Sequence, residues 1–241
     1  MKITPTVILF ILLLGFAGRA TAQETKLKWF GHAAFSITTP NGKVLLIDPW
    51  LSNPSNPEAK PELAANLVKL AGFPSKQAET DAIMGIGGEI QIADGEVTIA
   101  MTPAIHSSSV FNPKAGPNEP ERAYGGNPAG FVIAIKNGPT FYHSGDTAYF
   151  KDMETIGENY SIDVALLNIG GHFGMEPRMA AKAAQSVRAR IAIPHHFGTF
   201  PGIVQTADGF AAELKKLKID FYEMKPGETI SFRGKQLIKG K

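Results

Sequence analysis

The stretch "GFVIAIKNGPTFYHSGD" (residues 130–146) consists of two apolar runs separated by a turn and followed by a polar end. The pair Asn137-Gly138 between the runs is a strong signal for a tight β-hairpin. The second run leads directly into "HSGD", so that His143 and Asp146 come where the strand ends. The stretch therefore predicts a hairpin that brings a histidine and an aspartate to one edge of a β-sheet.

Two similar hairpins precede this one along the chain. They turn at the Asn-Gly pair 41–42 and at the Asp-Gly pair 94–95, and their second strands run out at Asp48 and His106. The segment 107–128 follows as a long irregular loop. Long loops in compact domains are often functional, so this segment is expected to lie beside a site.

The second half of the chain alternates between strands and helices. Apolar runs predict buried strands over 162–172 and 190–196, and apolar spacing on one face predicts helices over 176–189 and near 208–217. A further helix is predicted over 61–72, where Pro stands at the start and Gly at the end. Hairpins followed by strand–helix alternation predict an α/β fold of two sheets with helices packed outside.

The N-terminus has the composition of a secretory signal peptide. Lys2 precedes the apolar run 7–17, and an Ala-x-Ala site ends at Ala22. A membrane anchor is the alternative reading, but the run is shorter than the roughly 20 residues that a spanning helix needs. We therefore predict residues 1–22 as a signal peptide, 23–241 as a single domain, a secreted or periplasmic location, and no stable membrane anchor after cleavage.

Charge and cysteine content exclude several kinds of site. The formal net charge is +2, and it becomes 0 when the signal peptide with Lys2 and Arg19 is removed. A near-neutral protein has no general attraction for nucleic acid or anionic lipid, so we expect a small-molecule substrate instead. The chain has no cysteine, which excludes disulfides, thiolate ligands and a cysteine-linked lipid anchor. Any metal site must therefore use His, Asp or Glu.

Several polar residues share one position, at or just past the end of an apolar strand: Asp48, His106, Asp146, His172 and His196. In layered folds such strand ends gather in one cleft. One such histidine would be an ordinary strand-end residue, but the repeated pattern favours a site. Histidine nitrogens and carboxylate oxygens suit zinc and, less exclusively, manganese or iron. Because the chain has no G-x-S-x-G elbow and no cysteine, metal-activated water is favoured over a serine or cysteine nucleophile.

Six stretches together resemble the metal-dependent hydrolase family within the metallo-β-lactamase superfamily. The resemblance covers nearly the whole chain after residue 22 and implies an αββα metallo-β-lactamase-like sandwich with a metal site at one edge between the sheets. The stretches are "WFGHAAFSI", "KVLLIDPWL", "TPAIHSSS", "YHSGDT", "NIGGHFGM" and "IPHHFGTFP".

The resemblance implies specific roles for four residues, and the position of His172 after two glycines adds a fifth candidate. His106 corresponds to the histidine of the third metal motif, Asp146 to the aspartate that bridges two metals, and His196 to the last histidine ligand. Asp48 corresponds to the aspartate that closes the second strand and supports the site. Asp146 and His172 are the candidate catalytic residues, with His172 placed to contact substrate or a transition-state oxyanion.

Three other histidines have weaker claims to a role. His32, in "FGHAAF", either lines the cleft or is a turn residue between strands. His143 stands three residues before Asp146 and could orient a ligand. His195 would point away from His196 if the strand continues, which favours a structural role.

The superfamily's most diagnostic motif, His-x-His-x-Asp-His, is absent from this chain. It belongs after Asp48, yet no histidine lies between His32 and His106. An inner strand, the motif loop and a helix are missing, roughly 30–40 residues by the usual size of such a unit. The neighbouring strands, among them Val44–Ile47 and Val97–Met101, must then meet directly or expose apolar faces, which predicts association into homo-oligomers.

Three functions follow from these observations. The first is a hydrolase that uses metal-activated water on an ester, lactone, amide or phosphodiester. The second is a catalytically impaired member of the same fold that acts as a binding protein or is an incomplete gene product. The third, a binding module without metal, is disfavoured by the strand-end His and Asp residues. With three surviving ligands, at most one zinc per chain is expected, where the complete family site holds one or two.

Overall fold

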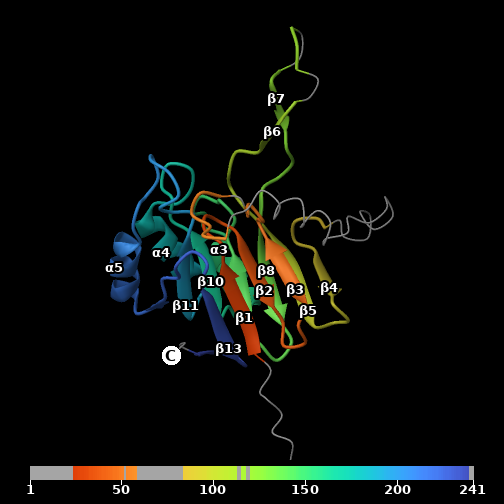
Figure 1. The fold of residues 1–241 in the computed structure, drawn as a ribbon, viewed down its shortest axis with the longest axis vertical. Helices are drawn as coiled ribbons and strands as arrows, with labels where there is room; N and C mark the ends of the chain where they lie inside the picture. Colours follow the sequence, from red (N-terminus) through yellow and green to blue (C-terminus); the bar gives the residue numbers. More distant parts are fainter. Residues whose placement is uncertain (1–23, 52, 59–83, 113–114, 118–119, 239–241) are drawn as a thin grey trace, which may run out of the picture.

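Two β-sheets form the centre of this computed structural model, which describes residues 24–51, 53–58, 84–112, 115–117 and 120–238 (Figure 1). The predicted signal peptide 1–22 and the predicted helix 61–72 lie outside the described residues. The first sheet is antiparallel and has the order β14-β13-β1-β2-β3. Its strands are β1 (Glu24–Trp29), β2 (Phe35–Thr38), β3 (Val44–Ile47), β13 (Thr229–Arg233) and β14 (Gln236–Ile238).

The second sheet is mixed and has the order β12-β11-β10-β9-β8-β5-β4. Strands β9 to β12 are parallel to one another, while β4, β5, β8 and β9 are joined as antiparallel neighbours. The strands are β4 (Glu89–Ile92), β5 (Val97–Pro103), β8 (Ala129–Ile135), β9 (Thr140–His143), β10 (Val164–Asn168), β11 (Ile191–His195) and β12 (Asp220–Phe221). The described helices are α3 (Met153–Asn159), α4 (Pro177–Ser186) and α5 (Asp208–Leu217).

The two sheets pack face to face, and helices cover one of them. Every residue of β10 and β11 is buried, because the first sheet covers one face and the helices cover the other. In β1 the burial alternates, with Leu27 and Trp29 inward and Lys26 outward. Phe141 of β9 meets Phe232 of β13 edge to face, with ring centroids 5.6 Å apart. Within the described residues, this gives the layers of a sandwich with α3, α4 and α5 on the side of the second sheet.

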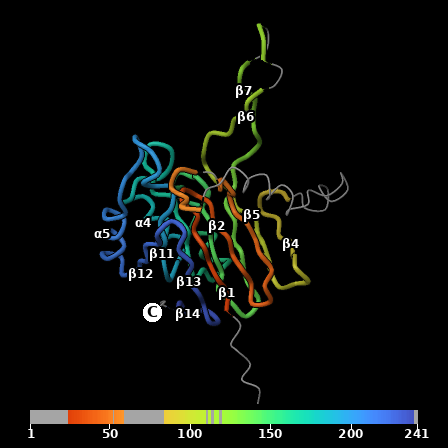
Figure 2. Tube along the Cα trace, viewed as in Figure 1, coloured from red at the N-terminus to blue at the C-terminus, as the bar shows by residue number. Residues whose placement is uncertain are grey.

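The hairpins predicted from Asn-Gly and Asp-Gly pairs are present. They join β2 to β3, β4 to β5 and β8 to β9. The turn residues Asp94 and Asn137 have φ of 55° and 60°, a region that Asp and Asn tolerate better than most residues. All three turns lie at one end of the sandwich, so the other ends of β3, β5 and β9 reach the opposite end together (Figure 2).

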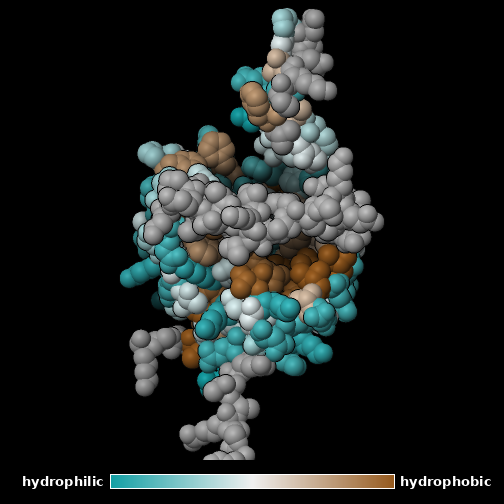
Figure 3. Space-filling view, turned by 45° about the vertical axis from the view of Figure 1, so that its right-hand side comes forward, coloured by the Kyte–Doolittle hydropathy of each residue, from teal (hydrophilic) through white to brown (hydrophobic). Residues whose placement is uncertain are grey.

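Strand β3 is the outermost described strand of the first sheet. It pairs with β2, while β5 pairs with β4 and β8, so Val44–Ile47 and Val97–Met101 do not meet. Val44 is 62% exposed and Leu46 is 37% exposed. Figure 3 turns this side of the molecule forward and shows a hydrophobic area there. As far as the chain is described, the structure thus has the second of the two predicted outcomes, a sheet edge without a neighbouring strand and with exposed apolar side chains.

Two parts of the chain differ from the expectations. The segment 107–128, predicted as irregular, contains a two-stranded ribbon of β6 (Ser109–Phe111) and β7 (Arg122–Tyr124) that projects from the body (Figure 1). The short helix α3 was not predicted either, and it has only seven residues. Within the described residues, no helix has the length and apolar character needed to cross a bilayer.

Candidate metal site

The site lies where β3, β9 and β11 end, in the turns that follow them. Asp48 comes directly after β3, Asp146 lies three residues after β9, and His196 follows β11. His32 joins them from the turn between β1 and β2. The strand-end residues Asp48, Asp146 and His196 are therefore brought to one edge between the sheets, as sequence reasoning predicted for the cleft.

Asp146, His196 and His32 form the centre of this site. The Nε2 atom of His196 lies 3.6 Å from Oδ1 of Asp146. The rings of His32 and His196 have centroids 3.9 Å apart. Among the described residues, Asp146 Oδ1 and His196 Nδ1 are buried atoms without a hydrogen-bond partner. Buried polar atoms are normally satisfied, so such atoms at one place indicate a ligand site.

Three residues at this edge have an unusual backbone conformation. His32, Asp48 and His196 have φ of 51°, 43° and 60°. Side-chain-bearing residues in this left-handed region cost of order 1 kcal/mol or more each and concentrate at functional sites. A Cβ on Gly170 would lie 2.5 Å from His196 Nδ1, so only glycine fits beside that ring. The strain and the close approach place the His196 ring next to Asp146.

The turn that carries His32 is fixed from several sides. Its carbonyl accepts hydrogen bonds from the His196 backbone N–H and the Trp29 indole N–H, both at 3.0 Å. Its ring nitrogen Nδ1 lies 3.0 Å from Thr199 Oγ1, and Trp50 meets the ring edge to face at 5.0 Å. His32 is therefore a residue of the turn between β1 and β2, and its ring also contacts that of His196.

A second layer of ionisable residues lies below the centre. His143 and His195 are buried and stack with ring centroids 4.7 Å apart. Gly145 N–H donates to His143 Nδ1 at 3.1 Å, so His143 is neutral and its Nε2 donates to Ala33 O at 3.3 Å. Asp48 Oδ2 lies 4.0 Å from His143 Nδ1. Burial raises the pKa of Asp48, and the nearby Asp146 adds to this while His143 opposes it.

His106 and His172 lie in loops outside this centre. Both are exposed, His106 three residues beyond the end of β5 and His172 in the loop after β10, with its ring against Phe173. Among the described residues, no group of three or more His, Asp or Glu side chains is arranged to hold a metal ion. Within this part of the chain His106 is thus not arranged with Asp146 and His196 to hold an ion, and its role as a ligand stays a prediction.

The residues at the centre nevertheless fit a metal in their chemistry. Asp146 Oδ1 is buried and unpartnered, His196 Nε2 faces it at 3.6 Å, and carboxylate oxygen and imidazole nitrogen are donors that zinc accepts. His32 adds a second imidazole within contact of the first. The chemistry of these donors therefore fits a metal ion.

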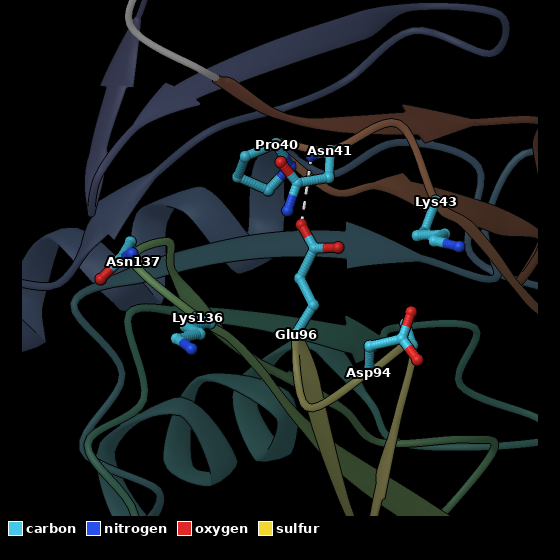
Figure 4. Close-up of a pocket in the computed structure, with 8 residues that line it drawn as sticks. Pro40, Asn41, Lys43, Asp94, Glu96, Lys136 and Asn137 are labelled. Carbon is cyan, nitrogen blue, oxygen red and sulfur yellow. Dashed lines mark hydrogen bonds between the residues drawn. The ribbon is translucent and has the colours of Figure 1, made fainter.

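A cavity of about 510 Å³ lies at the opposite end of the sandwich, among the three hairpin turns (Figure 4). It is lined by Lys43, Lys136, Asp94 and Glu96. Glu96 accepts a hydrogen bond from the Asn41 backbone N–H at 3.1 Å and so ties the two sheets together. No histidine is among the residues that line this cavity.

Sequence reasoning left two residues of this region out of the site. His195 stacks under His143, and Asn168, at the end of β10, holds the loops beside Asp146. The signal for Asn168 was available, since it is a polar residue in the apolar run "VALLN" followed by two glycines. The role of Asn168 depends on hydrogen-bond partners that are far from it in the sequence. The apolar run alone therefore does not predict this role.

We expect acid to destabilise the metal-free fold. Burial lowers the pKa of His195 well below 6.5, with His143 and His196 adding to the effect, and burial lowers the pKa of His143 although Asp48 opposes it. Burial and the neighbouring His196 lower the pKa of His32 to about 4, against the opposing effect of Asp146. The pKa values of these histidines are therefore lower in the folded protein than in the unfolded chain. On acidification the unfolded chain takes up protons at a higher pH than the folded protein does. The free energy of unfolding therefore falls as the pH decreases from about 6.5 toward 4.

Urea unfolding in the presence of a chelator at pH 7, 6 and 5 measures this effect. Each fully buried histidine adds up to about 1.4 kcal/mol per pH unit to the slope of the unfolding free energy against pH. His143→Gln should reduce the slope, while the exposed His106→Gln should leave it unchanged. Equal stability of the wild-type protein at pH 7 and pH 5 would contradict the prediction.

Comparison with known proteins agrees with this geometry. The sequence profile of the beta-lactamase superfamily domain matches residues 45–197. A UPF0173 metal-dependent hydrolase of Thermodesulfovibrio yellowstonii is 38% identical and is aligned over 92% of this chain and 98% of the relative. A UPF0173 metal-dependent hydrolase of Anaeromyxobacter dehalogenans is 40% identical over 89% of each chain.

The alignments also show that the relatives are longer inside the matched region. The match to the Thermodesulfovibrio protein extends over 264 positions, to which this chain contributes about 222 residues, 92% of its 241. About 42 aligned positions therefore have no residue in this chain. This number is close to the size of the strand–loop–helix unit that the sequence lacks.

Solved structures share the fold. Igni18, a metallo hydrolase from Ignicoccus hospitalis, has a TM-score of 0.69 and 28% identity over 87% of this chain and 98% of that chain. An isothiocyanate hydrolase from Delia radicum gut bacteria, with a TM-score of 0.57 and 18% identity over 86% of this chain and 99% of that chain, has the same fold. The metallo-β-lactamase-like sandwich is thereby confirmed, and the chain belongs to the UPF0173 family of metal-dependent hydrolases within the beta-lactamase superfamily.

Proposed function

We propose that this chain is an impaired hydrolase of its family, with one weak metal position at Asp146 and His196. The observation that carries the proposal is the contact of these two side chains, 3.6 Å apart, without a third donor arranged beside them in the described part of the chain. Two donors bind zinc less tightly than the three or four of ordinary protein sites. The absent His-x-His-x-Asp-His motif would have supplied further ligands.

His106 is the proposed third ligand, because its neighbour is tied to the loop that carries Asp146. The Ile105 N–H donates to Thr147 Oγ1, and the Ala148 N–H donates to Ile105 O, both at 2.8 Å. These two hydrogen bonds keep the backbone of residue 105 beside the loop. A change of the His106 rotamer is then the movement that would bring its ring toward Asp146.

The other site residues have supporting roles in this proposal. When bound, the ion would supply an activated water, since it lowers the pKa of water to about 7. His32 and Trp50 wall the site on one side, and exposed His172 is placed to contact substrate at the rim. His143 and Asp48 hold the turn below Asp146.

The substrate class and the location are parts of the same proposal. An ester, lactone, amide or phosphodiester suits hydrolysis by activated water, and the loops around the site decide among them. The composition of residues 1–22 supports export to the periplasm or the medium. A binding protein without turnover is the second candidate, favoured by the two-donor site.

Metal content tests the proposal. We expect the purified protein to hold at most one zinc per chain, and Asp146→Asn and His196→Gln each to weaken zinc binding about 10-fold or more in a chelator competition. His106→Gln should weaken it less, and His172→Gln should leave it unchanged while lowering any hydrolysis. Two tightly held zinc ions per chain would refute the two-donor site. Zinc binding without any hydrolysis of model esters, lactones or phosphodiesters would favour the binding protein.

A further inference from the structure

Asn168 is fully buried at the end of β10, between two loops of the site. Its amide nitrogen donates to the carbonyls of Gly145 and Thr147, both at 2.9 Å. Its Oδ1 accepts a hydrogen bond from the Met175 N–H at 2.6 Å. One side chain thus binds the loop 144–147 with its donor and the loop 170–175 with its acceptor.

The two carbonyls that Asn168 binds belong to the residues on either side of Asp146. The amide therefore fixes the peptide groups that determine where the Asp146 carboxylate points. The position of Asp146 matters because its Oδ1 lies 3.6 Å from His196 Nε2. The Asn168 backbone N–H also lies 3.2 Å from Ser144 Oγ, which adds a further link to the same loop.

The second loop is equally close to the metal position. It begins at Gly170, where a Cβ would lie 2.5 Å from His196 Nδ1, and it carries His172. The Gly171 N–H donates to Met175 O at 3.0 Å, which closes the loop over the Asn168 contact. A Cβ on Gly174 would collide with Asn168 Oδ1. The packing around the Asn168 amide leaves no room for a second arrangement.

We propose that Asn168 is the positioning residue of this site, which sets Asp146 against His196 and holds the His172 loop in register with them. The inference rests on the proposed metal position. The role requires an amide, because two carbonyls need donors and a backbone N–H needs an acceptor. A carboxylate of the same shape would keep the acceptor but would set oxygen against the carbonyls of Gly145 and Thr147.

Two measurements on Asn168→Asp test this role. Amide hydrogen exchange of the metal-free protein reports on the loops directly, and we expect at least about 10-fold faster exchange within both 144–147 and 170–175. Zinc affinity by chelator competition should fall about 10- to 100-fold, the usual effect of residues that orient metal ligands. The matched control is Asn56→Asp, since Asn56 is also buried and closes a different loop through Leu51 O and the Glu58 N–H.

Each outcome decides the inference. Faster exchange in both loops with weaker zinc binding, absent from the control, supports it. Wild-type exchange in either loop, or faster exchange with unchanged zinc affinity, overturns the positioning role. If the wild-type protein takes up no zinc, the proposed function fails, and hydrogen exchange alone decides whether Asn168 holds both loops. Should Asn168→Asp not fold, Gly174→Ala displaces the same amide by collision and is judged by the same criteria.

Discussion

A strand–loop–helix segment carrying His-x-His-x-Asp-His, inserted after Lys60, is expected to raise bound zinc from at most one to two ions per chain and hydrolysis by at least about 100-fold. The segment is designed with the roughly 30–40 residues expected of a strand–loop–helix unit. Its histidines and aspartate would join Asp146 and His196, which already lie in contact. A hundredfold rate increase corresponds to about 2.7 kcal/mol of transition-state stabilisation, well within what metal activation provides.

The insertion should also stabilise the fold. An added strand beside β3 would pair its open edge and cover Val44 and Leu46, so that the melting temperature rises. The matched control is the same insert with its histidines replaced by Gln, which should raise the melting temperature but not the zinc content or the activity. If the native chain already holds two zinc ions and turns over substrate rapidly, the missing unit is not needed and the impairment proposal is wrong.

The hairpins were predictable because their turns are local. An Asn-Gly or Asp-Gly pair with φ above zero specifies a tight turn without help from the rest of the chain, as Asn137 and Asp94 show. The ribbon β6–β7 was not predictable for the opposite reason. Its strands have three residues each and lie within a segment rich in Pro and Gly, so no periodic pattern reveals them.

The site was predictable where a polar residue directly follows an apolar strand. Asp48 and His196 follow that rule, and Asp146 comes soon after β9. His106 does not, since β5 ends at Pro103 and the intervening residues let its side chain turn to solvent. The position of His32 depends on a turn with positive φ and on contact with His196 from the other end of the chain, which no local pattern encodes.

The Pro and Asn residues of the segment Leu51–Lys60 predict a mobile connection without core residues. The second part of this prediction is wrong, because Leu51 packs with Phe30 and Ala34. Asn53 is buried and donates to the carbonyls of Phe30 and Trp50 at 3.1 and 2.7 Å. Asparagine favours such side-chain to backbone bonds, so within the described residues this segment is anchored beside the His32 turn.

Self-association through β3 is the second large effect that we expect. This strand is the outermost described strand of its sheet, and Val44 and Leu46 expose 62% and 37% of their surface. An open edge with apolar side chains is a template for strand pairing with another copy, and a formal net charge of only +2 does little to oppose it. Sedimentation velocity over a concentration series should therefore show the wild-type protein in reversible self-association.

The double variant Val44→Lys with Leu46→Lys is expected to weaken this association at least about 10-fold. Losing about 1.4 kcal/mol is enough for that factor, and burial of even one such side chain contributes about 1.5–3 kcal/mol. Phe111→Lys is the matched control, because Phe111 is 68% exposed but lies on the ribbon β6–β7 instead of the sheet edge. If Phe111→Lys abolishes association while the β3 variant does not, the ribbon is the interface and the open edge is covered in another way. If the β3 variant alone becomes monomeric, the inserted segment should have the same effect, because the new strand would occupy the edge that pairs the copies.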